Sequence, residues 1–131
     1  MRVFEQLDYI YHPSRDVAAD VAYLVDRLGA RLVFAIDAMG TRVAMVELTD
    51  GPPQIVLAGH LEGDQPILVY RVPDLEVATS ELKRRGADPG HALEIPQGPV
   101  RSFFVPGGQR VAIYELSRPG VVDSFAGRRD F

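Results

Sequence analysis

The 131-residue sequence contains no cysteine and no tryptophan, and Lys83 is its only lysine. Without cysteine, the chain can form no disulfide bond, thiolate metal site or cysteine nucleophile. Its net charge is −4 and its pI is about 5.3, so it lacks the basic surface that phosphate backbones attract. No apolar run approaches the roughly 20 residues of a membrane span, and the first residues do not resemble a signal peptide. We therefore expect a cytoplasmic protein that binds neither nucleic acid nor membrane.

A repeated order of local signals is the main feature that the sequence does contain. A strand-like run, an aspartate, an amphipathic helix ending at glycine, and further strand-like runs occur twice. Asp16 and Asp74 are suited to cap the two helices, and they differ by 74 − 16 = 58 positions. Gly29 and Gly86, which suit the left-handed ends of these helices, differ by 86 − 29 = 57. One folding unit is used twice.

The apolar periodicity predicts one strand, one helix and three strands in each unit. We predict strands at residues 3–11, 31–36, 42–48, 54–58, 66–72, 92–95, 101–105 and 109–116, and helices at 17–28 and 75–85. The units cover about 3–58 and 66–116, within a single domain spanning 1–116. Residues 117–131 are predicted to be a loosely attached C-terminal extension. A hydrophobic content of 47% is enough for a sizeable core.

Two motifs extend this pattern. The run Val72-Pro73-Asp74-Leu75 leads into the second helix, and Phe104-Val105-Pro106-Gly107-Gly108-Gln109-Arg110 precedes the last strand. The layout and motifs resemble the vicinal oxygen chelate superfamily, which includes glyoxalases, extradiol dioxygenases and bleomycin resistance proteins. The second motif departs from the usual turn at Val105, where aspartate is common. The resemblance implies an α+β fold, with tandem βαβββ units forming cupped mixed sheets, helices outside and a ligand cavity in the concavity.

The same resemblance implies a divalent metal held by His, Gln or Glu in four strands. Counting from the capping aspartates and the turn proline places three of these positions at Tyr9, Ile67 and Ala112. The fourth falls within residues 54–56, where Gln54 is the candidate donor. Because the side chains of Ile67 and Ala112 cannot donate an electron pair, the usual metal site is predicted to be lost. We therefore expect no metal ion and no other cofactor.

Other polar residues were considered as replacements for these ligands. His12, His60 and His91 fall at predicted strand ends or in loops, where solvated side chains are expected. Strand alternation turns Glu115 away from the cavity, and Glu47 is expected to have a structural or surface role.

An aromatic and basic surface is predicted in place of the metal. Tyr9, Tyr11 and Tyr114 are placed on the cavity face, and Arg101 and Phe103 share one face of the neighbouring strand. These five residues are the predicted ligand-binding residues. They would hold a planar or amphipathic organic ligand by ring stacking, with Arg101 pairing with an anionic or carbonyl oxygen. Ordinary core packing is the alternative explanation for the aromatic residues.

Three functions remain open from the sequence. The first is a metal-independent small-molecule-binding protein of the glyoxalase/bleomycin resistance type. The second is a metal-dependent lyase or dioxygenase of the same superfamily with atypical ligands. The third is a scaffold whose cavity is filled by its own side chains. The resemblance also implies a homodimer, because members commonly cover their sheet edges and apolar surface by pairing.

Overall fold

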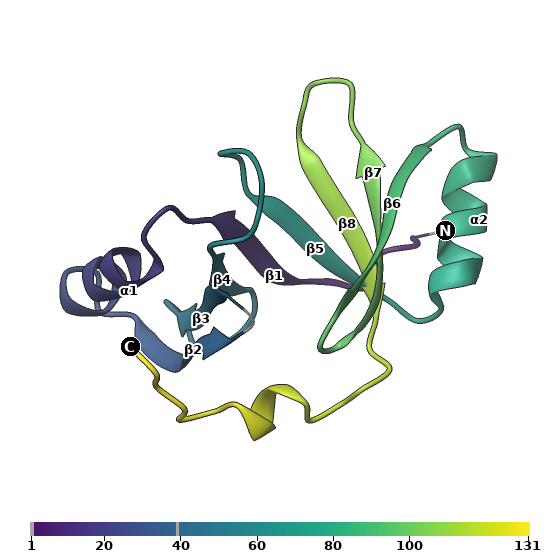
Figure 1. The fold of residues 1–131 in the computed structure, drawn as a ribbon. Coiled ribbons are helices and arrows are strands. Elements are labelled where there is room, and N and C mark those ends of the chain that lie inside the picture. The colour runs from purple at the N-terminus through teal and green to yellow at the C-terminus, as the bar shows by residue number, and fades with distance from the viewer. Residues whose placement is uncertain (1, 39) are drawn as a thin grey trace.

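The computed structural model describes residues 2–38 and 40–131, and it confirms the predicted α+β fold (Figure 1). The first unit comprises β1 (Gln6–Pro13), α1 (Val17–Asp26), β2 (Arg31–Ala38), β3 (Thr41–Glu47) and β4 (Gln54–Ala58). The second comprises β5 (Ile67–Val72), α2 (Leu75–Arg84), β6 (Asp88–Ile95), β7 (Gly98–Phe104) and β8 (Arg110–Glu115). A short 3-10 turn follows at Val122–Ser124. The predicted turn at 37–40 includes Met39, which lies outside the described residues.

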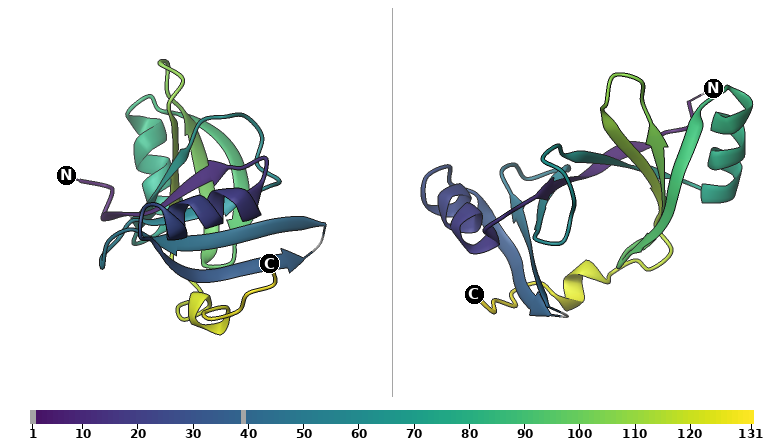
Figure 2. Two further views of the ribbon diagram at one scale, coloured as in Figure 1. Left: turned by 90° about the vertical axis from the view of Figure 1, so that its left-hand side faces the viewer. Right: turned by 45° about the horizontal axis from the view of Figure 1, so that its top comes forward.

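All eight strands form one mixed sheet in the order β2-β3-β4-β1-β5-β8-β7-β6. β1 and β5 pair antiparallel at the centre and join the two units. The sheet curves, and the helices lie at its outer ends (Figures 1 and 2). α1 covers the convex surface of the first unit around Ala44 and Leu57, whereas α2 covers that of the second around Ile113. The opposite surface is concave.

Both helices begin at the predicted residue and end shortly before the predicted one, at Asp26 and Arg84. The Asp16 carboxylate accepts a hydrogen bond from the backbone N–H of Ala19 at 3.0 Å, and the Asp74 carboxylate accepts one from Val77 at 2.9 Å. Gly29 and Gly86 have φ angles of 77° and 89°. Each helix has ten residues, and no helix in the described part of the chain is long and apolar enough to cross a membrane.

Two strand boundaries differ from the prediction. β1 begins at Gln6, and the preceding Phe4 packs its ring against Tyr70 with 5.0 Å between centroids. β6 begins at Asp88 and is interrupted between Pro89 and Ala92, where its pairing with β7 shifts. The apolar pattern of residues 92–95 therefore marks only the second part of this edge strand.

The C-terminal extension crosses the open side of the curved sheet and reaches the far edge of the first unit (Figure 2). Gly127 donates its backbone N–H to Val33 at 2.8 Å, and Ala35 donates to Arg128 at 2.9 Å. The Phe125 ring packs 5.7 Å from that of Phe34. These contacts contrast with the loose attachment expected from the sequence, and they cover part of the edge of β2.

Deleting residues 121–131 is expected to lower the free energy of unfolding by about 2 kcal/mol, since backbone hydrogen bonds and a partly buried phenylalanine are lost. It also frees the edge of β2, so we expect concentration-dependent self-association. Urea unfolding and sedimentation velocity measure the two effects. Arg129→Ala, which keeps the extension, is the control, and a truncated chain with the same stability and oligomeric state as the full chain would contradict this role.

Candidate functional site

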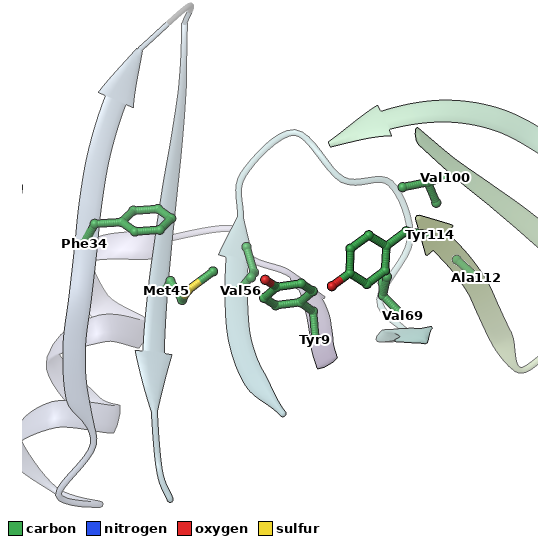
Figure 3. Close-up of a cluster of buried hydrophobic side chains, with 8 residues drawn as sticks. All are labelled: Tyr9, Phe34, Met45, Val56, Val69, Val100, Ala112 and Tyr114. Carbon is green, nitrogen blue, oxygen red and sulfur yellow. The ribbon is translucent and has the colours of Figure 1, made fainter. Parts of the chain in front are cut away.

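The middle of the concave face is a cluster of buried side chains contributed by both units (Figure 3). Its members are Tyr9, Phe34, Met45, Val56, Val69, Val100, Ala112 and Tyr114. Strand register explains the grouping, because Tyr9 lies opposite Val69, and Val69 lies opposite Ala112. Tyr9 and Tyr114 come from the two units and approach to 5.8 Å between ring centroids.

A pocket of about 340 Å³ lies at one end of this face, and we name it the concave polar pocket. Its charged lining residues are Asp8, Glu47, Asp50 and Arg71. Tyr9 and Tyr114 lie at the boundary between the pocket and the apolar cluster, because both residues line the pocket and also belong to the cluster. The pocket thus combines aromatic surface with charges of both signs.

Asp8 is held on the pocket side by an irregularity in β1. The pairing of β1 with β5 shifts between Leu7 and Tyr9, so Asp8 departs from strict strand alternation. The Tyr114 hydroxyl donates to Asp8 Oδ2 at 2.5 Å, and the Gln6 amide donates to Oδ1 at 2.5 Å. Only 8% of Asp8 is exposed, and these two hydrogen bonds compensate for the burial of its carboxylate.

Arg71 and Glu47 line this pocket together with Asp8. Arg71 Nε is 3.8 Å from Asp8 Oδ2 and 3.7 Å from a carboxylate oxygen of Glu5. Glu47 accepts a hydrogen bond from Gln54 Nε2 at 3.2 Å and forms an ion pair with Arg31. The Arg71 side chain is 33% exposed, which leaves its guanidinium accessible from solvent.

Gln97 closes the concave face from the turn between β6 and β7. The residue is 3% exposed, and its Oε1 has no hydrogen-bond partner among the described residues. Its backbone oxygen accepts from the N–H groups of Ser117 and Arg118 at 3.1 and 3.0 Å. The turn and the start of the C-terminal extension are thus fastened together.

Burial raises the pKa of Tyr9, Tyr11 and Tyr114 above the ordinary phenol value. The hydrogen bond that Tyr114 donates to Asp8 raises the pKa of its phenol further. The Gln97 side chain acts in the opposite direction on the pKa values of Tyr9 and Tyr11, with a smaller effect. All three phenols are therefore neutral hydrogen-bonding groups at physiological pH.

The raised tyrosine pKa values predict the alkaline behaviour of the protein. The native state keeps its phenolic protons to higher pH than the unfolded chain, whose tyrosines have the ordinary pKa of 10.0. This contribution to stability is full below pH 10 and is lost as the pH rises above it. We expect the tyrosinate absorbance of these three residues to appear only together with unfolding, followed by circular dichroism. Their ionisation in the folded protein near pH 10 would contradict this assignment.

The structure brings together three of the five predicted ligand-binding residues. Tyr9 and Tyr11 lie 6.2 Å apart between ring centroids, and Tyr9 contacts Tyr114. The predicted placement of Arg101 and Phe103 on the cavity face is wrong. Phe103 packs in the convex cluster beneath α2, and Arg101 alternates to that same side of β7.

The register of β7 explains this correction. Val100 lies opposite Tyr114, and Arg101 lies opposite Ile113. Since directly paired residues share a face, Val100 belongs to the concave side and Arg101 to the convex side. Arg71 provides the guanidinium in the concave polar pocket.

Three residues of the site did not emerge from the sequence. Arg71 follows Val69 by two positions, so strand alternation could have placed it on the concave face. Strict alternation along residues 7–11 predicts Asp8 on the face opposite Tyr9, because a bulge has no clear sequence signal. Gln97 lies in a turn, where no periodicity applies. Glu47, for which a structural or surface role was expected, lines the pocket.

The positions that the superfamily uses for metal ligands do not carry suitable donors. Tyr9, Val56 and Ala112 are buried in the concave cluster, and Ile67 packs against it. Gln54 is engaged by Glu47. Residues 2–38 and 40–131 contain no group of three or more His, Asp or Glu side chains that could hold a metal ion. The residues present therefore do not fit the divalent metal that the sequence resemblance implies.

The remaining candidates lie apart from one another. His60 Nδ1 is 3.5 Å from the Thr41 hydroxyl, while His91 lies within β6 and its backbone N–H donates to Ser102. His12 lies near the end of β1. Glu115 accepts the backbone N–H of Leu75 at 2.8 Å and so caps α2 on the convex side, as strand alternation predicts.

No protein-family model and no curated protein matches the sequence. Solved structures do match. Methylmalonyl-CoA epimerase from Mycobacterium tuberculosis aligns with a TM-score of 0.73 and 20% identity, over 88% of this chain and 90% of that one. The chain has the fold of this epimerase. The α+β fold of two tandem units, predicted from the sequence, is thus the fold of known proteins.

Two further structures share this fold. A hypothetical protein from Bacillus halodurans C-125 has a TM-score of 0.71 and 18% identity, over 84% of this chain and 93% of that one. A methylmalonyl-CoA epimerase from Streptomyces coelicolor, in complex with 2-nitronate-propionyl-CoA, has a TM-score of 0.70 and 14% identity, over 88% and 96%. At sequence identities this low, the structural similarity establishes the fold alone. The function must be inferred from the site.

Proposed function

We propose that this protein binds a small planar or amphipathic organic molecule in the concave polar pocket without using a metal ion. The main support for this proposal is the buried Asp8 carboxylate that lines the pocket. It accepts a hydrogen bond from Tyr114 and lies close to Arg71. Such a constellation orients a ligand by hydrogen bonds and charge. Of the positions that would hold a metal, Tyr9, Ile67 and Ala112 carry a phenol and two hydrocarbon side chains, and the Gln54 amide is hydrogen-bonded to Glu47.

The lining indicates the chemistry of the ligand. The carboxylates of Asp8 and Glu47 accept hydrogen bonds from hydroxyl or amino groups, and Arg71 donates to a carbonyl or carboxylate oxygen. The rings of Tyr9 and Tyr114 offer a surface for a planar group. We infer a ligand that carries both donor and acceptor groups on a compact, partly apolar frame. A methylmalonyl-CoA epimerase of this fold has been solved in complex with methylmalonyl-CoA, which supports the proposal that the ligand is a small organic molecule.

Metal content and ligand binding together test this proposal. We expect no stoichiometric metal by elemental analysis of the purified protein, and no thermal stabilisation by zinc, nickel, manganese or iron. A screen of small hydroxylated or aromatic carbonyl and carboxylate compounds should yield a ligand that stabilises the protein. Arg71→Gln should weaken that ligand about tenfold or more, whereas Arg84→Gln should not, because Arg84 lies on α2 and pairs with Glu81.

Two results would overturn the proposal. A stoichiometric metal, or a large stabilisation by one, would favour a metal-dependent lyase or dioxygenase with atypical ligands. Failure of every compound to bind, with the concave face closed by its own side chains, would favour a scaffold.

A homodimer is a further part of the proposal. The outer edge of β6 is not paired with another strand in the described sheet, and Phe104 next to it is 62% exposed. Such surfaces are commonly covered by association. Light scattering coupled to size exclusion should give twice the chain mass, and a concentration-independent monomer would contradict it.

A further inference from the structure

We propose a second binding site on the convex side, between α2 and the strands β6 and β7, that takes an amphipathic organic anion with its carboxylate at Arg101. A cavity of about 730 Å³ lies there, well away from the concave polar pocket. Its polar side chains include Thr79, Lys83 and Arg101. This volume is within the usual range for small-molecule sites.

The internal repeat allows the surroundings of Arg101 in the second unit to be compared with the equivalent place in the first unit. β1 and β5 are equivalent strands, offset by 58 residues, as Tyr11 and Val69 illustrate (69 − 11 = 58). Tyr11 pairs in parallel with Val56 of β4, and Val69 pairs in parallel with Ala112 of β8. The strands β4 and β8 are therefore equivalent residue by residue.

One residue further along, Leu57 of β4 pairs with Ala44, and Ile113 of β8 pairs with Arg101. Arg101 thus occupies the position that Ala44 has in the first unit. Ala44 is fully buried beneath α1. A small apolar residue has been replaced by the longest cationic side chain.

The helices differ at the matching positions. Val21 and Val25 of α1 pack in the cluster that contains Ala44, and an offset of 58 places Thr79 and Lys83 there in α2. Valine side chains close the gap between α1 and its sheet, whereas threonine and lysine leave the cavity open. The first unit thus has an apolar contact between its helix and sheet, whereas the second unit has a cavity lined by hydrogen-bond donors at the same place.

The charges at this cavity are not balanced by the protein. Arg101 Nε is buried and has no hydrogen-bond partner among residues 2–38 and 40–131. Neither Arg101 nor Lys83 forms an ion pair within the described chain. Of the two lining glutamates, Glu94 is paired with Arg118 at 2.5 Å, which leaves Glu76. Two cations against one carboxylate favour an anionic occupant.

The rest of the lining is apolar and defines the other part of the occupant. Leu75 lines the cavity from α2, and Ala92 lines it from β6, where it pairs with Arg101 and so shares its face. A carboxylate can accept hydrogen bonds from the guanidinium of Arg101 while the hydrocarbon portion of the same molecule covers Leu75 and Ala92. A medium-chain monocarboxylate has this chemistry.

Calorimetric titration with sodium octanoate at pH 7 tests the inference, with octanamide as the neutral probe of equal length. We expect octanoate to bind and octanamide to bind about tenfold more weakly or not at all. Arg101→Ala should fold, because alanine is the residue at the equivalent position of the first unit, and circular dichroism checks this. It should weaken octanoate about tenfold or more, and Lys83→Gln should weaken it less.

The controls separate this site from a general charge effect and from the concave polar pocket. Arg84→Gln removes the same charge from the exposed, Glu81-paired side of α2 and should leave octanoate affinity unchanged. Arg71→Gln should also leave it unchanged, so the result does not depend on the proposed function. Equal affinities of wild type and Arg101→Ala, equal binding of octanamide, absence of octanoate binding, or a loss confined to Arg71→Gln would overturn the inference.

Discussion

Gly98→Ala is expected to destabilise the protein by about 3 kcal/mol or more, because the added methyl group meets backbone that cannot move aside. A Cβ at residue 98 would lie 1.9 Å from the carbonyl oxygen of Glu115. Relief requires the turn between β6 and β7 to separate from the end of β8. That movement would break the hydrogen bonds between Gln97 and residues 117–118. Chemical denaturation measures the loss.

Gly108→Ala is the matched control for this prediction. Gly108 also lies in a hairpin turn and has a φ of +87°, but a Cβ there meets nothing within 4 Å. We expect it to cost about 1 kcal/mol through backbone strain alone. If Gly98→Ala costs no more than Gly108→Ala, the close approach to Glu115 has no energetic significance. Displacement of Gln97 should also alter the amide resonances of Tyr9 and Tyr11.

Tyr114→Phe is expected to lower the free energy of unfolding by about 2 kcal/mol, since it leaves a buried carboxylate without one of its hydrogen-bond donors. The Tyr114 hydroxyl donates to Asp8 at 2.5 Å, and Asp8 is almost completely buried. The side chain otherwise keeps its packing, because only the hydroxyl is removed. Urea unfolding at pH 7 measures the effect.

A double-mutant cycle with Asp8→Ala distinguishes the hydrogen bond from other consequences. In the Asp8→Ala background, Tyr114→Phe should cost less than about 1 kcal/mol, because the acceptor is already absent. Tyr70→Phe is the control, since its hydroxyl makes no hydrogen bond within the described residues while its ring packs on Phe4. An equal cost of Tyr114→Phe in both backgrounds would show that the two groups are not coupled.

The concave site also shows where inference from the sequence was insufficient. Alternation along β1 placed Asp8 away from Tyr9, but the shifted pairing at that residue brings it to the pocket. Alternation along β8 correctly turned Glu115 toward α2, because that strand pairs without a shift. Strand alternation predicts the face of a residue reliably only where the pairing with the partner strand is regular. A shift in that pairing depends on the partner strand.

The face of Arg101 depended on a longer-range relationship. Side chains along β7 point to alternate faces, as expected. The register between β7 and β8 decides which of these side chains face the cavity. A slip of one residue exchanges the two faces of a strand. That register is set across the turn at residues 105–109, where Phe104 pairs with Arg110, and it places Arg101 opposite Ile113.

The sequence by itself determined the repeated unit, the two helices and the class of fold. These features depend on hydrogen bonds and apolar spacing within a few residues, as at Asp16, Gly29, Asp74 and Gly86. Only the tertiary structure decided the site, because Asp8 and Tyr114 meet through pairings between strands far apart in the chain. It also decided the path of the C-terminal extension, whose hydrogen bonds go to β2 rather than to neighbouring residues. Local chemistry specifies elements, whereas the packing of all eight strands specifies which side chains share a pocket.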